Sequence, residues 1–501
     1  LDYVRLNGGP LNNYGTVSPG GWGVVQTTAL DGAYVQTASG VYDFDLDLAH
    51  TGHAGEVDLL AATGTAQLQG SYVLNVLDPD DALPGSHVAT IISAQGGLSA
   101  SNLMLDAPSS VIARFELINN VQNLDIHYTI NFAPTDIGLN LNQLAVGQHI
   151  NAIQTAGSPA FGPIAGELFY VSSPDTLKAI YDSFSPETYA DEIAAVDLAT
   201  ERFTDSMMSC PLSTDQFKVR GDSCAWAKAT GTWLGLQATA NNQAFDEQSA
   251  GVAGGYEKQV SGHIRLGYAL SADNVTGGMG FRNDASGMRY QGGLVAKGDW
   301  ADWGLDLAAA FGTEKLSTSR TVLTPQNAFT ALGQQRMTWE AYTARFSRTW
   351  RYDGRFGGLY AKPMFEVSDV RVRNGPLAET GAGPLDLDAP AQWQNEARIS
   401  PKLELGAETL LGGFAYRPYV RGGFTRVLDG EEPLFDAAFA SAPAGVPDFV
   451  TTAKLDRMTA DAEAGLTIVG PGGASARLGW FGQFGKRTDE QGAALKFTLP
   501  F

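Results

Sequence analysis

The sequence predicts an all-β fold with a short helical segment in the middle of the chain. Three observations carry this prediction: short strand-like runs in residues 1–135, helical spacing of apolar residues in 136–220, and long period-two alternation in 221–501. A chain of 501 residues exceeds one ordinary core, so we expect two or more domains. Its longest uncharged apolar run falls short of the ~20 residues that a membrane-spanning helix needs, which disfavours a helical membrane protein.

Charge is distributed unevenly along the chain. The sequence has 33 Lys plus Arg against 54 Asp plus Glu, a net charge of −21, which excludes a general nucleic-acid binder. Residues 1–220 hold 6 basic and 24 acidic side chains, whereas 221–501 hold 27 and 30, so two domains of different kind meet near residue 220. The chain begins with Leu1 and shows no signal-peptide pattern, so we expect the C-terminal piece of a longer, processed precursor.

Two cysteines are present, Cys210 and Cys224, and polar sequence separates them. A zinc site would need four ligands, and no nearby His or Cys supplies the others, so the pair favours a disulfide. Two free thiols are the alternative. An oxidising compartment follows if the bond forms.

Residues 1–135 consist of short strand-like runs separated by Gly, Asn and Pro. Between residues 41 and 48, apolar and acidic side chains alternate, which is typical of a half-buried strand. Turn residues recur along the segment, but the copies are too diverged for a repeat count. A right-handed β-helix and a β-sandwich both fit this pattern.

Helical spacing begins after residue 135, with runs around 139–153 and 175–184, and the longest predicted helix covers 186–208. Ser185 can cap this last helix, and Pro186 is tolerated at the first helical position. Ile193 and Val196 form a narrow apolar stripe that charged side chains surround. A helix that is polar nearly all round is either a solvated connector between domains or lies in a polar lumen.

Residues 221–501 show the strongest pattern, because long segments alternate apolar and polar residues with period two. In 394–407, for example, Ile399 and Leu403 share one parity, while charged residues such as Arg398 and Glu404 occupy the other. The segments run nearer the ~10 residues of an outer-membrane barrel strand than the ~5 or 6 of a sandwich strand. About twelve such segments, joined by alternating short and long connections, predict an antiparallel transmembrane β-barrel.

The parity assigns the polar side chains of these strands to the lumen and the apolar ones to lipid. The charged residues expected to face the lumen are Arg345, Arg351, Lys362, Glu366, Arg398, Lys402, Arg421, Arg457, Asp461 and Glu463. Aromatic residues near the predicted strand ends are expected to form girdles at the membrane interfaces. They are Trp226, Trp233, Trp300, Trp303, Trp339, Trp350, Trp480 and Phe484.

Several segments resemble one family of secreted bacterial proteins. The strings GTVSPGG, GAYVQTASGVYDFDL, VDLLAATGTAQLQG and HVATIISAQGG are similar to the last passenger rungs and autochaperone region of bacterial autotransporters, the type V secretion family. The last strand, GAALKFTLPF, resembles the outer-membrane assembly signal, with Leu495, Phe497, Leu499 and Phe501 on one face, although Pro500 departs from the usual penultimate residue. With the helix 186–208 and the first strand, WAKATGTWLG, the resemblance to the translocator part covers 136–501.

This resemblance implies the end of a right-handed β-helix in 1–135, a linker in 136–220 whose helix of about 186–208 lies in the lumen, and an approximately 12-stranded barrel in 221–501. Four acidic residues of that helix are then expected to face inward Arg or Lys side chains: Glu192, Asp197, Glu201 and Asp205. The implied function is export of the N-terminal passenger and its display at the cell surface. A plain outer-membrane pore or a surface adhesin anchored by the barrel is the alternative.

The resemblance also implies the partners. These are outer-membrane lipid, the barrel assembly machinery and periplasmic chaperones, with the protein itself a monomer.

Signals of catalysis and of metal binding are weak. The GDS string at 221–223 would need a His base and an orienting carboxylate, and the only later His is His263, so a chance match is favoured. His50 and His53 lack a third ligand, and the acidic residues around Asp80 lack the spacing of a calcium loop. We therefore expect no enzyme activity, no metal and no cofactor.

Overall fold

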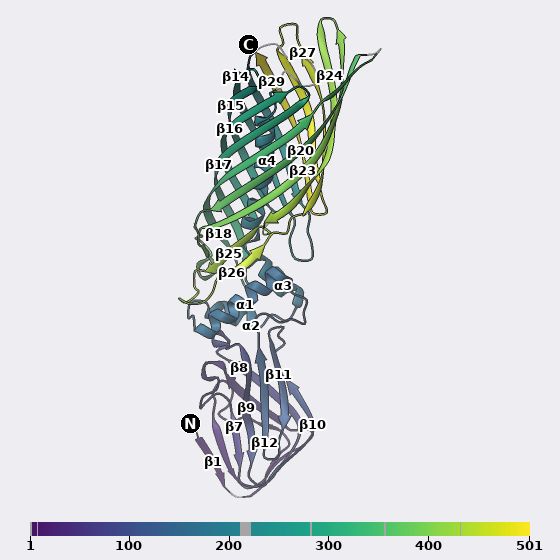
Figure 1. The fold of residues 1–501 in the computed structure, drawn as a ribbon. Coiled ribbons are helices and arrows are strands. Elements are labelled where there is room, and N and C mark those ends of the chain that lie inside the picture. Colours follow the sequence, from purple (N-terminus) through teal and green to yellow (C-terminus); the bar gives the residue numbers. More distant parts are fainter. Residues whose placement is uncertain (1–2, 8, 211–221, 281–282, 355–356, 431) are drawn as a thin grey trace.

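The computed structural model describes residues 3–7, 9–210, 222–280, 283–354, 357–430 and 432–501. The molecule is elongated, with a β-rich N-terminal unit at one end, a long β-barrel at the other and a group of helices between them (Figure 1). The expected boundary between linker and barrel, at residues 220 and 221, lies outside the described residues. Of the residues described, no helix combines the length and apolarity needed to cross a bilayer.

The N-terminal unit is built from two six-stranded sheets. The first contains, in spatial order, β1 (Tyr3–Asn7), β4 (Thr27–Asp31), β7 (Leu59–Ala62), β9 (Gly85–Ala94), β12 (Asn123–Ile130) and β11 (Ala113–Asn119). The second contains β2 (Leu11–Asn13), β5 (Tyr34–Gln36), β8 (Ala66–Leu77), β6 (Val41–Asp47) and β3 (Thr16–Val17), with β10 (Leu98–Asp106) paired to β8. Short 3-10 turns follow β6 and β8, at Leu48–His50 and Pro79–Asp81.

Strand pairing decides between the two architectures that the sequence allowed for this unit. Strands β1, β4, β7 and β9 pair in parallel, and so do all strands of the second sheet, whereas β9, β12 and β11 pair antiparallel. Parallel pairing between successive strands fits stacked rungs, because a β-sandwich is built from antiparallel pairs. The core between the sheets includes the buried rings of Tyr34, Tyr42, Phe44 and Tyr72.

Three helices connect this unit to the barrel: α1 (Leu141–Ala156), α2 (Gly162–Phe169) and α3 (Pro174–Phe184). Asn140 and Gln143 form a reciprocal capping box at the start of α1, and Gly157 ends it with a φ of 75°, a conformation that suits Gly. Ser173 accepts a hydrogen bond from the Thr176 amide at the start of α3. The local sequence therefore sets both ends of α1 and the start of α3.

Helix α4 spans Glu187–Met207, within one residue of the predicted 186–208 at each end. The predicted cap was wrong. Ser185 ends α3, and α4 has no side-chain cap, because Pro186 directly precedes its first turn. The Ser185 hydroxyl instead lies 3.5 Å from Thr451 Oγ1.

The barrel is closed by pairing of its first strand with its last. Its twelve strands are β13 (Ser223–Leu236), β14 (Phe245–Ser261), β15 (Ile264–Met279), β16 (Asn283–Trp300), β17 (Trp303–Leu323), β18 (Ala328–Arg348), β20 (Gly357–Asn374), β23 (Gln392–Leu411), β24 (Phe414–Gly430), β27 (Met458–Val469), β28 (Ser475–Phe484) and β29 (Thr488–Pro500). A short strand, β19 (Trp350–Gly354), pairs with β20 at one end. The predicted antiparallel twelve-stranded barrel is confirmed.

The connections differ at the two ends of the barrel. At the end far from the helices they are short, as between Ser261 and Ile264 or Trp300 and Trp303. At the end facing the helices, longer connections form β21 (Leu377–Ala378), a 3-10 turn (Gly383–Leu385), β22 (Leu387–Ala389), β25 (Leu434–Phe439) and β26 (Phe449–Thr452) (Figure 1). This asymmetry is typical of outer-membrane barrels, whose long loops lie outside the cell.

Exposed aliphatic and aromatic side chains cover the outer wall of the barrel, as the parity predicts. Two of the expected girdle residues are exceptions, since Trp226 and Trp339 are only 5% and 3% exposed. Both belong to the inward parity of their strands, and the Trp226 ring lies 4.9 Å from Lys496 Nζ. The remaining tryptophans of the predicted girdles are exposed: Trp233, Trp300, Trp303, Trp350 and Trp480.

Candidate functional site

The most distinctive feature of the barrel is that α4 fills much of its lumen (Figure 1). Nearly all of its residues are buried, and it packs against β14, β15, β16, β17 and β20. Buried apolar residues of α4, such as Ile193 and Val196, belong to the same core as residues of that wall. The polar faces of the helix therefore need partners on the inner surface of the barrel.

Two of the predicted acidic residues are bound by cations of β23. Asp197 pairs with Arg398, which also pairs with Glu201 at 3.2 Å. Glu201 is in addition 3.4 Å from Lys402 Nζ. All four side chains are at most 13% exposed, so these pairs replace much of the hydration that the lumen does not provide.

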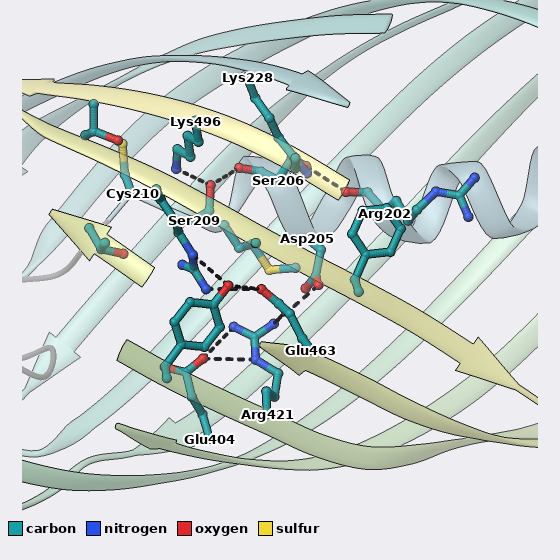
Figure 2. Close-up of a pocket in the computed structure, with 18 of the residues that line it drawn as sticks. Arg202, Asp205, Ser206, Ser209, Cys210, Lys228, Glu404, Arg421, Glu463 and Lys496 are labelled. Carbon is teal, nitrogen blue, oxygen red and sulfur yellow. Dashed lines mark hydrogen bonds and ion pairs between the residues drawn. The ribbon is translucent and has the colours of Figure 1, made fainter. Parts of the chain in front are cut away.

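Asp205 lies near the C-terminal end of α4 and joins a second ion-pair network. It pairs with Arg345 of β18 and is 3.5 Å from Arg421 of β24. Figure 2 shows Arg421 between two carboxylates of the wall, Glu404 at 2.7 Å and Glu463 at 2.8 Å. The network thereby connects the helix to neighbouring strands.

Glu192 does not make the predicted pair. Both of its carboxylate oxygens are buried without a hydrogen-bond partner among the described residues. Arg289 carries the positive charge on this side, but Glu247 and Glu314 already bind it at 3.1 and 2.7 Å. The charge of this cation is already compensated by two glutamates of the wall.

Sequence reasoning missed other contacts of α4. Arg487 Nη2 is 2.9 Å from Asp191 Oδ1, although Arg487 lies in the turn between β28 and β29, where strand parity carries no information. Arg202 of the helix pairs with Glu490 of β29. Glu490 has the inward parity of its strand, so alternation in the last strand could have identified it.

The remaining predicted lumen charges divide into two groups. Lys362, Glu366, Asp461 and Glu463 are inside, and Glu366 is 2.6 Å from Arg345. Arg351 and Arg457 are exposed, contrary to prediction. Arg351 belongs to β19, beyond the end of β18, and lies 3.6 Å from Asp302. Arg457 precedes β27, so the parity of that strand does not extend to it.

The structure joins Cys210 and Cys224 in a disulfide, and both residues are buried. The bond connects the segment after α4 to the start of β13. At the other end of the barrel sequence, the outward side chains of β29 are exposed, as on the other strands. They are Leu495, Phe497 and Leu499, and Phe501, directly after the strand, is exposed as well.

A cavity of about 450 Å³ lies beside the C-terminal half of α4 (Figure 2). The barrel wall around it is formed mainly by β20, β23, β24 and β27 to β29, and of these strands β20 also packs against the helix. Of the described residues that line it, nine are Lys or Arg and seven are Asp or Glu. The lumen is thus polar and only partly filled.

The other candidates for chemistry lie apart from one another. Ser223 accepts a hydrogen bond from Tyr256, and His263 is exposed with Asp299 as its nearest acidic partner, 3.9 Å away. His50 contacts Asp47, and Asp80 packs against α2 at Gly166. Within the described ranges, no group of three or more His, Cys, Asp or Glu side chains is arranged to hold a metal ion.

Comparisons with known proteins agree with this architecture. Residues 225–480 match the model of the autotransporter β-domain. The translocator domain of autotransporter NalP from Neisseria meningitidis superposes with a TM-score of 0.50 at 14% identity, covering 63% of this chain and 99% of that one. The transport unit of the Escherichia coli autotransporter AIDA-I gives a TM-score of 0.43 at 12% identity, covering 63% and 98%.

A curated relative, an extracellular serine protease of Serratia marcescens, is 23% identical over 201 residues. The match covers 37% of this chain and 19% of the relative, so it spans about a fifth of that protein. The β-domain match, by contrast, covers half of the present chain. Together with the closed barrel and its lumen helix, it shows that this chain belongs to the autotransporter family, whose outer-membrane β-barrel exports a passenger.

Proposed function

We propose that the barrel has exported the N-terminal unit and that α4 is the part of the translocated chain that remains in its lumen. In this proposal, residues 1–135 are the last β-helix rungs and autochaperone region of the passenger, displayed at the cell surface. Residues 136–220 are the linker, and 221–501 are the translocator. The observation that carries the proposal is the position of α4, because the chain must pass through the lumen to connect the two units.

Ion pairing supports a stable, plugged state after export. Asp197, Glu201 and Asp205 all meet inward cations, and they lie on successive turns of the helix. A buried carboxylate without a partner costs several kcal/mol, so these pairs favour one position of α4 over a sliding helix. Such a fixed helix closes the route that the passenger used.

Contacts at the helix side of the barrel support a passenger end that rests on the barrel mouth. Asn142 of α1 exchanges two hydrogen bonds of 3.1 Å with the Thr452 backbone. His149 of the same helix contacts the Pro447 carbonyl and the Phe439 amide of the long loop. Helix α1 of the linker, which follows the exported unit, is therefore anchored to the loops.

The partners follow from this role. The outer wall takes lipid, the outward face of β29 is the proposed signal for the barrel assembly machinery, and periplasmic chaperones deliver the chain before assembly. The protein acts as a monomer, since the barrel closes within one chain. We infer that this chain contributes export and anchoring and takes no catalytic part. The Serratia relative is described as a protease, but the match covers only 19% of it.

Planar-bilayer recordings test the plug. A chain of residues 209–501 lacks α4 but keeps the whole barrel and both cysteines, whereas a chain of 185–501 keeps the helix. We expect the shorter chain to show a much larger single-channel conductance, because the helix fills much of the lumen. Equal conductance of the two chains would mean that the helix does not lie in the lumen. The alternative function, an outer-membrane pore or a surface adhesin anchored by the barrel, would then replace the proposal.

A further inference from the structure

Two lysines face each other on the inner wall of the barrel, beside the cavity next to α4. Lys228 of β13 and Lys496 of β29 are direct partners in the antiparallel register, and Arg477 of β28 is the next residue in the same row. Lys496 is 7% exposed, and both lysines line the cavity. Like charges directly opposite each other on neighbouring strands are destabilising, so this row needs compensation.

The contacts of these lysines supply little negative charge. Lys228 Nζ donates to Ser206 Oγ at 2.8 Å, and Lys496 Nζ donates to Ser209 Oγ at 2.5 Å (Figure 2). Their remaining contacts are with aromatic rings, Phe481 at 6.0 Å and Trp226 at 4.9 Å. Within the described part of the chain, neither lysine forms an ion pair with a carboxylate.

Carboxylates near this row are already bound to other cations. Glu463 pairs with Arg477 at 3.1 Å, and Glu257 pairs with Lys297 at 2.8 Å. The C-terminal end of α4 contributes about half a negative charge through its dipole, which is less than the two positive charges it meets. The excess is notable in a chain with a net charge of −21.

We propose that the lumenal cavity binds a soluble phosphate-type oxyanion between Lys228 and Lys496, beside Ser206 and Ser209, whose hydroxyl oxygens accept from the two ammonium groups. Ammonium groups are common ligands of phosphate, and each has three N–H donors, of which the Ser oxygen takes one. The cavity of about 450 Å³ has room for the anion beside the helix. Both lysines point away from the lipid-facing side of the wall, so the anion comes from solution and not from a lipid headgroup.

Occupation of this site connects three parts of the molecule. The anion would contact the first strand, the last strand and the end of α4, which are the elements that close the barrel and fill it. The anion site goes beyond the proposed export function, because the site would stabilise the closed barrel once the helix is in place. The expected consequence is that phosphate stabilises the folded protein.

Isothermal titration of the full chain in a zwitterionic detergent tests the site, with inorganic phosphate as the probe. We expect saturable binding that is at least tenfold weaker in Lys228→Met and in Lys496→Met. Lys486→Met is the control, because Lys486 is exposed in the turn before β29 and should bind phosphate like the unsubstituted protein. Absence of saturable binding, or binding that persists in the double Met variant, would overturn the proposal.

Two further measurements guard against a variant that simply fails to fold. Lys228→Arg and Lys496→Arg keep the charge and should retain binding, while unheated electrophoretic mobility reports whether each barrel is closed. In the unsubstituted protein, phosphate should raise the unfolding temperature more than chloride at equal ionic strength. An equal effect of the two salts would show screening alone and would also overturn the proposal.

Discussion

Asp58 shows how a single buried residue makes the N-terminal unit sensitive to pH. It is 0% exposed, and its carboxylate accepts hydrogen bonds from the amides of Gln26 at 2.6 Å and Asp45 at 2.9 Å. The pKa of Asp58 is raised to about 7, mainly by burial and to a smaller extent by the neighbouring Asp45 and Asp43, while the two amide hydrogen bonds oppose the shift. A carboxyl group that binds its proton more tightly when folded stabilises the fold most at low pH.

We therefore expect the strands around Asp58 to lose stability as pH rises from about 4 to about 7. Hydrogen exchange of residues 41–62 in the full chain, corrected for the intrinsic pH dependence of exchange, measures this. In Asp58→Asn the dependence should flatten, because the amide does not titrate. Asp106→Asn, at an exposed position, is the control and should keep the slope. A slope that survives in Asp58→Asn would contradict this account.

At the scale of elements, Arg398 is the strongest single attachment between β23 and α4. It contacts Asp197 and Glu201 of the helix and Glu396 of its own strand. Replacing it with Met leaves these carboxylates without that partner, at a cost on the order of 3 kcal/mol. We expect Arg398→Met to loosen α4, seen as frequent openings in planar-bilayer recordings. Arg457→Met, which removes an exposed Arg just before β27, should stay as closed as the unsubstituted protein, and equal opening in both variants would refute this attachment.

The position of Arg398 also illustrates how much of the barrel and its lumen can be predicted from sequence alone. Period-two alternation predicts the twelve strands and the inward position of residues such as Arg398, because a side chain in a regular strand has only two directions. The rule fails where the strand ends, as at Arg351, Arg457 and the bound Arg487. Alternation also cannot show which of several carboxylates binds a given cation. Glu247 and Glu314 bind Arg289, and the Glu192 oxygens have no hydrogen-bond partner among the described residues.

The architecture of the N-terminal unit could not be predicted from the alternation of apolar and polar residues alone. Alternation within a short strand is the same in a β-helix and in a sandwich, and only the pairing of distant segments distinguishes them. The docking of α1 on the loop between β25 and β26 involves residues about 300 positions apart in the sequence, such as His149 and Pro447. No local signal predicts such a contact.

At the scale of the whole molecule, His149 connects the linker that carries the exported unit to the barrel loops. It is 3% exposed, with Nδ1 3.0 Å from the Pro447 carbonyl and Nε2 accepting the Phe439 amide at 3.2 Å. This arrangement requires the neutral imidazole ring. Protonation of Nε2 would place its N–H against the Phe439 amide N–H, and the hydrogen bond between them would be lost. Burial lowers the pKa of His149 by more than the Pro447 carbonyl and Asp448 raise it. The free ring thus takes up a proton at a higher pH than the docked one.

The docked state should therefore be fully stable above about pH 6.5 and weaken as the pH falls below that value. We expect hydrogen exchange of residues 434–452 to quicken at pH 5 relative to pH 7.5, after correction for intrinsic exchange, while the barrel strands stay protected. His149→Gln should lose protection already at pH 7.5, because its amide does not reproduce both ring contacts. His53→Gln changes an exposed histidine and should behave like the unsubstituted protein. If the loop exchanges at the same rate at both pH values, its attachment to α1 does not depend on the protonation of the His149 ring, and this account is wrong.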